Sequence, residues 1–212
     1  MTDQPRIRGL YAIADSHWLT EDRFAPAVRD ALAGGARIIQ YRDKLSAPAI
    51  REAIARTLVD LSHEHAALFL VNDDAALARA VGADGVHLGR EDMAIAQARE
   101  QLGPGAVIGI SCYNDLERAR AAERAGADYV AFGRFFPSRT KPQAAPATPA
   151  LLRQARAALR VPIVAIGGIT PDNGASLIDA GADALAVIEG VFGQPDIRAA
   201  AERYAKLFRP TP

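Results

Sequence analysis

The sequence has little of several features that would assign it to a specialised class of protein. Its 212 residues include one cysteine, Cys112, so no disulfide can form within the chain. Lys plus Arg and Asp plus Glu number 25 each, and a zero net charge argues against a dedicated nucleic-acid-binding protein. No apolar run approaches the ~20 residues that span a bilayer, and residues 1–15 lack a signal-peptide pattern. We therefore expect a cytoplasmic protein with no nucleic-acid partner and no membrane partner.

The chain does contain the alternation of apolar runs and helical segments that is typical of α/β proteins. Hydrophobic residues make up 50% of it and charged residues 24%, which is ordinary globular composition, and the length predicts one domain over residues 1–212. Short, near-continuous apolar runs predict strands that are buried on both faces of a parallel sheet. These runs are 9–15, 37–42, 67–72, 85–88, 107–111, 128–133, 162–166 and 184–188.

A repeated tripeptide indicates that the predicted sheet closes on itself. Gly-Ala followed by Arg or Asp precedes every second predicted strand, starting at Gly35, Gly82, Gly126 and Gly181. The repeat recurs about every two strand–helix units, and glycine suits the left-handed position that ends a helix. Eight strand–helix units in a small chain predict a single (β/α)₈ TIM barrel, and an open doubly wound sheet is the alternative. The segment 137–149 holds four prolines, which predicts an active-site loop.

Basic side chains follow the predicted strand 37–42. Gln40, Arg42 and Lys44 alternate with period two, so they share one face, and we expect that face to point into the mouth of the barrel. Two cations and an amide on one face predict an anion site. The alternative is a solvated strand end in which the cations pair with Asp43.

Acidic side chains follow the next two predicted strands. Asp73 comes after the strand 67–72 and Asp92 after the strand 85–88, so we expect both to lie close enough to share a cation. Mg²⁺ typically takes one or two carboxylates together with water and phosphate oxygens. The alternative is that Asp74 and Asp92 cap helices.

The remaining predicted strand ends offer further polar groups. Ser111 could bind a phosphate or the substrate, Asn114 is expected to cap the helix that follows, and Cys112 is expected to be a buried small hydrophobe. Glycine-rich turns after the strands 162–166 and 184–188 predict a backbone phosphate site. We expect the four histidines, His87 among them, and Tyr11 to be structural.

Seven motifs, in order, resemble those of bacterial thiamine-phosphate synthases: QYRDK, VNDD, DGVHLGRED, GIS, DYVAFGRFFPSRTK, PIVAIGGITPDN and ALAVIEGVF. The resemblance runs from about residue 9 to residue 192. It implies a (β/α)₈ barrel and an Mg²⁺-dependent transferase. The implied reaction joins 4-amino-5-hydroxymethyl-2-methylpyrimidine diphosphate to a thiazole phosphate, which is 4-methyl-5-(2-phosphoethyl)thiazole or its carboxylate. Its products are thiamine phosphate and pyrophosphate.

The resemblance also implies a role for each matching residue. It makes Asp73 and Asp92 the Mg²⁺ ligands and Ser111 a residue beside the pyrimidine diphosphate. It implies that Ser138 and Thr140 contact the thiazole phosphate, whose phosphate binds at Gly168 and the backbone of Ile188 and Glu189. The diphosphate ligands that it implies are Gln40, Arg42, Lys44, Asn72 and Lys141. The implied mechanism expels pyrophosphate from a stabilised pyrimidine cation, with Arg42, Lys44, Lys141 and the metal ion balancing the charge.

Three alternatives stay open. A related thiazole tautomerase would carry a histidine two residues after Ser111, where this chain has Tyr113, and it would not need the two carboxylates. A barrel that binds thiamine precursors without turnover is kept open by Glu189, which stands where the family usually has Ser or Thr. A phosphosugar isomerase or aldolase would use Lys44 or Lys141 and would leave the carboxylate pair unexplained. The oligomeric state cannot be predicted from the sequence.

Overall fold

A computed structural model of the chain describes residues 7–89, 92–137 and 146–208, and over these ranges eight parallel strands close into a barrel. Each strand pairs with the next along the chain, and the last pairs with the first. The strands are β1 (Gly9–Asp15), β2 (Ile38–Arg42), β3 (Leu68–Asn72), β4 (Gly85–Leu88), β5 (Val107–Tyr113), β6 (Tyr129–Gly133), β7 (Ile163–Ile166) and β8 (Ala184–Val187). The predicted (β/α)₈ barrel is confirmed, and the alternative of an open sheet is wrong.

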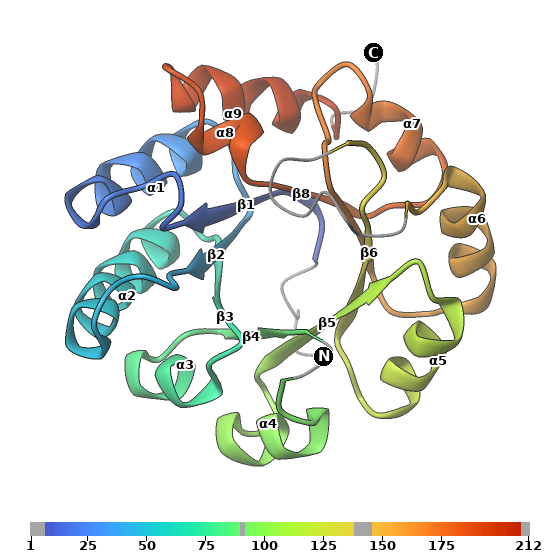
Figure 1. Ribbon diagram of the computed structural model, residues 1–212, viewed down its shortest axis with the longest axis horizontal. Coiled ribbons are helices and arrows are strands. Elements are labelled where there is room, and N and C mark those ends of the chain that lie inside the picture. The colour runs from blue at the N-terminus through green and yellow to red at the C-terminus, as the bar shows by residue number, and fades with distance from the viewer. Residues whose placement is uncertain (1–6, 90–91, 138–145, 209–212) are drawn as a thin grey trace.

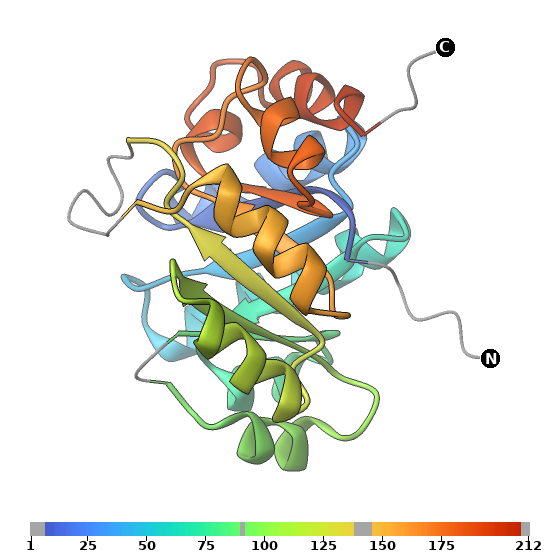
Figure 2. The ribbon, with the colours of Figure 1, turned by 90° about the vertical axis from the view of Figure 1, so that its right-hand side faces the viewer.

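Helices surround the barrel as an outer ring (Figure 1). They are α1 (Phe24–Ala33), α2 (Pro48–Glu64), α3 (Ala75–Val81), α4 (Ile95–Leu102), α5 (Leu116–Arg124), α6 (Pro149–Ala158), α7 (Gly174–Asp179), α8 (Glu189–Phe192) and α9 (Ile197–Lys206), and a short 3₁₀ helix, Glu21–Arg23, precedes α1. The side view shows α5 and α6 packed along the outside of the strands (Figure 2). No helix in the described part of the chain is long and apolar enough to cross a membrane.

Alternation along each strand separates two cores. Side chains that point outward, such as Phe69, Val86 and Phe132, join a large apolar cluster between the barrel and its helices. Side chains that point inward, such as Ile38, Leu70 and Val164, form a smaller cluster inside the barrel. Because successive strand residues face opposite sides, each inward position near the carboxyl end of a strand points toward the mouth.

The repeated Gly-Ala-Asp tripeptide closes the opposite end of the barrel. Asp84, Asp128 and Asp183 each accept a hydrogen bond from a backbone N–H in the first two residues of a neighbouring strand, at 2.7, 2.8 and 2.8 Å. Each carboxylate also pairs with a basic side chain on a preceding helix, namely His63, Arg99 or Arg156. The glycines of the repeat have positive φ angles, as expected for residues that end helices. The repeat therefore stabilises the barrel and lies away from its mouth.

Most predicted boundaries agree with the structure within one residue, and the differences have local causes. Strand β5 runs two residues further than predicted, because its pairing with β6 shifts register between Ser111 and Tyr113. Asn114 was expected to cap α5, but Asp115 does so, by accepting a hydrogen bond from the backbone N–H of Arg118. Helix α6 begins at Pro149, the last residue of the predicted loop, and residues 138–145 of that loop lie outside the described residues.

Candidate functional site

A cavity of about 710 Å³ opens at the carboxyl ends of the strands. Many of the residues predicted for the site line it, and they come from β2, β3, β5 and the turns after β7 and β8: Gln40, Arg42, Asn72, Ser111, Gly168, Ile188 and Glu189. Lys44 and Asp73 line a neighbouring hollow of about 420 Å³, and Asn72 lines both spaces. The structure thus brings these residues to one end of the barrel, which is where TIM-barrel proteins build their active sites.

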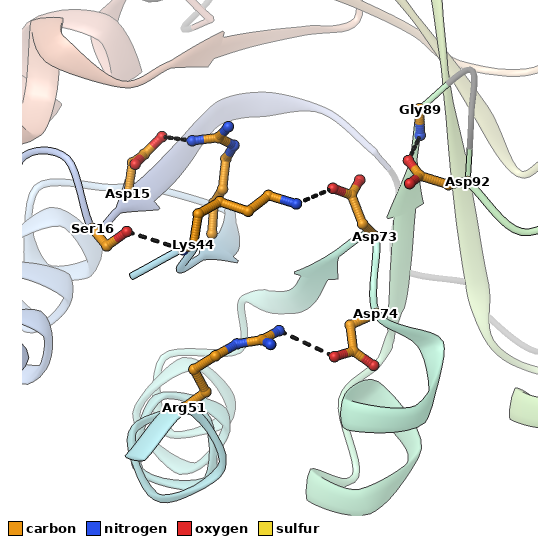
Figure 3. Close-up of polar contacts among 9 residues, drawn as sticks. Asp15, Ser16, Lys44, Arg51, Asp73, Asp74, Gly89 and Asp92 are labelled. Atoms are coloured by element: carbon orange, nitrogen blue, oxygen red, sulfur yellow. Dashed lines mark hydrogen bonds and ion pairs between the residues drawn. The ribbon is translucent and has the colours of Figure 1, made fainter. Parts of the chain in front are cut away.

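Each of the two predicted cations at the end of β2 is held by a carboxylate from another strand. Arg42 Nη1 lies 2.6 Å from Oδ2 of Asp15, which ends β1 and is 1% exposed. Lys44 Nζ lies 2.6 Å from Oδ2 of Asp73, which follows β3 (Figure 3). The backbone N–H of Lys44 also donates to the Ser16 hydroxyl at 3.1 Å. Sequence reasoning missed Asp15, although its place next to Arg42 in the pairing of β1 with β2 follows from the strand register.

Asp43, the alternative partner for these cations, is engaged elsewhere. It accepts hydrogen bonds from the Tyr41 hydroxyl and from the backbone N–H groups of Leu45 and Ser46. Burial alone would raise the pKa of Asp43, but the hydrogen bonds from Ser46 and Leu45 lower it to about 2. The alternative in which Asp43 neutralises Arg42 and Lys44 is therefore wrong.

The two predicted metal carboxylates are neighbours whose pKa values shift in opposite directions. Burial would raise the pKa of Asp73, but Lys44 and Asp92 lower it below the ordinary value. Burial and the neighbouring carboxyl group of Asp73 raise the pKa of Asp92. The backbone N–H of Gly89 donates to Asp92, so Asp92 does not cap α4, whose N-cap is Ala94. Asp74, by contrast, caps α3 through the Leu77 N–H at 2.9 Å, as its alternative interpretation predicted.

Two neighbouring carboxylates form a donor set that a divalent cation can bind. Among the described residues no group of three or more His, Cys, Asp or Glu side chains could hold a metal ion. An ion at Asp73 and Asp92 would therefore take its other ligands from water or from a bound phosphate, as Mg²⁺ commonly does.

A chain of hydrogen-bonded side chains crosses the inside of the barrel below the cavity, and sequence reasoning missed most of it. Tyr11 bonds to Gln40 and to Tyr129, Tyr129 bonds to His87, and His87 bonds to Ser111. Tyr11 and His87, which we expected to be structural, also line the cavity. The alternation of inward and outward positions along β1 and β4 could have placed both residues inside the barrel.

Ser111 and Cys112 lie on opposite faces of β5. Ser111 lines the cavity, whereas Cys112 is fully buried in the outer core and donates weakly to the carbonyl of Ile110. Burial raises the pKa of the Cys112 thiol to about 12. A thiol that is buried and protonated is a poor nucleophile, so the expectation of a buried small hydrophobe is confirmed.

The turn after β7 lies against the segment that follows β6. Gly167 and Gly168 have φ angles of 104° and 65°, and a Cβ atom on Gly168 would lie 2.3 Å from the Pro137 carbonyl oxygen. Only glycine allows this close approach. Arg134, which sequence reasoning did not single out, also lines the cavity here. The predicted residues Ser138, Thr140 and Lys141 lie outside the described residues.

Known proteins are similar to this chain both in sequence and in fold. A family model described as thiamine monophosphate synthase matches residues 10–191. The chain is 57% identical to the thiamine-phosphate synthase of Nitrosococcus oceani, covering 95% of this chain and 93% of that protein. It is 51% identical to the thiamine-phosphate synthase of Alcanivorax borkumensis, covering 96% and 95%. Its structure is similar to that of a thiamine phosphate pyrophosphorylase from Pyrococcus furiosus, with a TM-score of 0.86, 41% identity and 94% of each chain covered.

Proposed function

The chain belongs to the thiamine monophosphate synthase family, and from this premise we propose how its barrel carries out the family's reaction. It is a transferase that joins 4-amino-5-hydroxymethyl-2-methylpyrimidine diphosphate to 4-methyl-5-(2-phosphoethyl)thiazole or its carboxylate. The products are thiamine phosphate and pyrophosphate. The proposal concerns the mechanism, the metal ion and the role of each residue.

The proposed reaction is dissociative. The bond between the pyrimidine methylene carbon and the diphosphate oxygen breaks first, and its electron pair leaves with pyrophosphate. The electron-rich aminopyrimidine stabilises the methylene cation that remains, and the thiazole nitrogen then donates its lone pair to that carbon. No protein nucleophile takes part, which agrees with the buried and protonated state of Cys112.

The observation that carries the proposal is the meeting of cations and carboxylates at one rim. Arg42 and Lys44 lie at the end of β2, and the carboxylates of Asp15 and Asp73 hold them at 2.6 Å each. A preorganised donor that contacts departing negative charge is typically worth ~3–4 kcal/mol of transition-state stabilisation. We assign Gln40, Arg42, Lys44 and Asn72 to the diphosphate, together with Lys141 on the strength of the family motif.

Asp73 and Asp92 are the residues that would hold Mg²⁺. When bound, this ion would neutralise part of the negative charge that develops on the departing pyrophosphate. Its fit is supported by the opposite shifts in the pKa values of the two carboxyl groups, as expected for neighbouring anionic groups. Lys44, already bound to Asp73, places a second positive charge beside the same position.

The second substrate is assigned to the opposite side of the cavity. The turn that contains Gly167 and Gly168 and the backbone of Ile188 and Glu189 line this side, and exposed backbone N–H groups suit a phosphate. Ser138 and Thr140 are assigned to the same substrate from the family motif alone. Ser111 also lines the cavity, and we assign it to the pyrimidine diphosphate from the family motif.

The test is a turnover assay on the purified chain. Both substrates are mixed with and without Mg²⁺, and thiamine phosphate and pyrophosphate are measured together. Equal amounts of the two products, formed only with the metal ion, are expected. Binding of both substrates without pyrophosphate release would overturn the proposal in favour of a non-catalytic binding protein.

We also propose that the protein is located in the cytoplasm. Its single buried cysteine is consistent with a reducing compartment.

A further inference from the structure

We infer, on the basis of the proposed function, that the hydrogen-bond chain inside the barrel runs in one direction and makes Ser111 a donor to the substrate. Two buried tyrosines and one histidine then fix the direction of the Ser111 hydroxyl, in addition to any contact that Tyr11 and His87 make in the cavity that they line. No motif of the sequence assigned a role to these three residues.

The hydrogen-bond chain consists of four short contacts between side chains from five strands. Gln40 Nε2 lies 2.6 Å from the Tyr11 hydroxyl, which lies 2.8 Å from the Tyr129 hydroxyl. The Tyr129 hydroxyl lies 2.8 Å from His87 Nδ1, and His87 Nε2 lies 2.9 Å from Ser111 Oγ. Tyr11, Tyr129 and Gln40 are buried, with exposed fractions of 1%, 0% and 3%. Buried polar groups of this kind must satisfy one another.

The direction follows from the chemistry of the first link. An amide nitrogen can only donate, so Tyr11 accepts from Gln40. Of the two groups bonded to the Tyr11 hydroxyl, only the Tyr129 hydroxyl can accept a proton, so the Tyr11 proton points to Tyr129. Tyr129 then donates to His87 Nδ1. A neutral imidazole that accepts at Nδ1 carries its proton at Nε2, which therefore donates to Ser111 Oγ. The proton of the Ser111 hydroxyl is left to point into the cavity, which Ser111 lines.

Packing of the aromatic rings holds the hydroxyl groups and the imidazole in the positions that these hydrogen bonds require. The His87 and Tyr129 rings stack with centroids 5.6 Å apart, and Tyr11 meets Tyr129 edge to face at 6.1 Å. Tyr129 reaches across β5 at Gly109, where a Cβ atom would lie 1.9 Å from the ring. A hydroxyl with a fixed donor direction recognises an acceptor atom, such as a ring nitrogen of the aminopyrimidine or an oxygen of its diphosphate.

The first experiment reads the tautomer of His87 directly. The protein is labelled with ¹⁵N-histidine, and His87→Gln identifies the His87 signals among those of the four histidines. In the folded, substrate-free protein we expect a neutral ring with its proton on Nε2. A ring with its proton on Nδ1 would mean that the chain runs the other way, and a doubly protonated ring would mean that it has no direction. Either result would overturn the inference, and neither bears on whether the protein makes thiamine phosphate.

The second experiment asks whether Tyr129 acts through Ser111. Ser111→Ala and Tyr129→Phe are each expected to lower kcat about ten-fold, because each removes one well-placed hydrogen bond. The double variant is expected to be no slower than Ser111→Ala, since Tyr129 has no role once Ser111 is gone. Losses that multiply in the double variant would overturn the inference.

Tyr41→Phe is the matched control for the second experiment. It also deletes the hydroxyl of a buried tyrosine, but Tyr41 points outward from β2 into the outer core. We expect its kcat to stay within about two-fold of the unmodified protein. A loss as large as that of Tyr129→Phe would show that any buried hydroxyl has this effect, and it would count against a directed chain.

Discussion

At the scale of single residues, aspartate side chains form ion pairs with the basic side chains at the mouth of the barrel. Arg42 and Lys44 both border space that a ligand can occupy, yet each has its charge matched by an aspartate from a neighbouring strand. Asp15, and Asp73 in addition to its proposed role at the metal ion, therefore orient these cations, which limits the reorganisation needed when a diphosphate binds. Asp15 is the more buried of the two, so its removal is the cleaner test of this view.

Asp15→Asn is expected to lower turnover about ten-fold or more, because the Arg42 guanidinium loses the anionic partner that fixes it. Asparagine keeps an oxygen that can still accept the hydrogen bond from the His17 backbone N–H, which limits the damage to the fold. Pyrophosphate release is measured at saturating substrate together with the thermal midpoint. Glu52→Gln is the control, since it makes the same chemical change in an exposed pair with Arg56. Turnover within about two-fold of the unmodified protein would refute a positioning role for Asp15.

Cys112 is expected to be unreactive in the folded protein. Its thiol is buried and has a pKa of about 12, so thiolate forms appreciably only as the pH approaches that value. Iodoacetamide at about pH 8 should therefore label it slowly, and labelling should become rapid after unfolding in urea. We also expect Cys112→Ser to leave kcat within about three-fold. A large loss of kcat would revive a covalent mechanism.

At the scale of elements, the local pattern of the sequence was sufficient to predict where the strands lie and where the helices end. Apolar runs predicted all eight strands, and glycine at Gly82 or Gly126 predicted where helices end. The contacts of His87 could not be predicted in the same way, because Tyr129 lies 42 residues away and reaches it across Gly109. Strand alternation alone could have placed His87 inside the barrel, but which side chains meet there depends on the register of β4, β5 and β6.

The closing repeat at the bottom of the barrel leads to a prediction about stability. Asp128 accepts from the Ile108 N–H and pairs with Arg99 at 2.6 Å, so Asp128→Ala leaves both groups without this partner. We expect the free energy of unfolding, measured by urea denaturation, to fall by about 1–3 kcal/mol. Turnover per folded molecule should not change, since Asp128 lies at the end of the barrel away from the cavity.

Glu117→Ala provides the comparison for Asp128→Ala. Glu117 forms an exposed pair with Arg120 three residues further along α5, and such pairs contribute about 0.5 kcal/mol or less. Equal losses of stability in the two variants would mean that Asp128 is only another surface charge.

At the scale of the whole molecule, the closed barrel brings together groups that are far apart in the sequence. Strands β1, β2, β3 and β5 and the turns after β7 and β8 all contribute residues to one mouth. The resemblance identified these positions by motif, whereas the chain's own periodicity could indicate only that they lie at strand ends. Ser138 and Thr140, which the family motif assigns to the thiazole phosphate, lie outside the described residues.

The last prediction concerns the metal ion and has a readout that does not require turnover. We expect Mg²⁺ and pyrophosphate together to raise the thermal midpoint of the protein, since ligands that bind only the folded state stabilise it. Asp92→Asn should abolish this shift and lower turnover at least ~100-fold, because it removes one of the two carboxylates assigned to the ion. Lys141→Ala should lower turnover to a similar extent.

Asp74→Asn is the matched control for Asp92→Asn. Asp74 follows Asp73 directly, and asparagine can still cap α3. The same midpoint shift in Asp92→Asn and Asp74→Asn would mean that Asp92 does not bind the ion, and the proposed leaving-group stabilisation would then need another source.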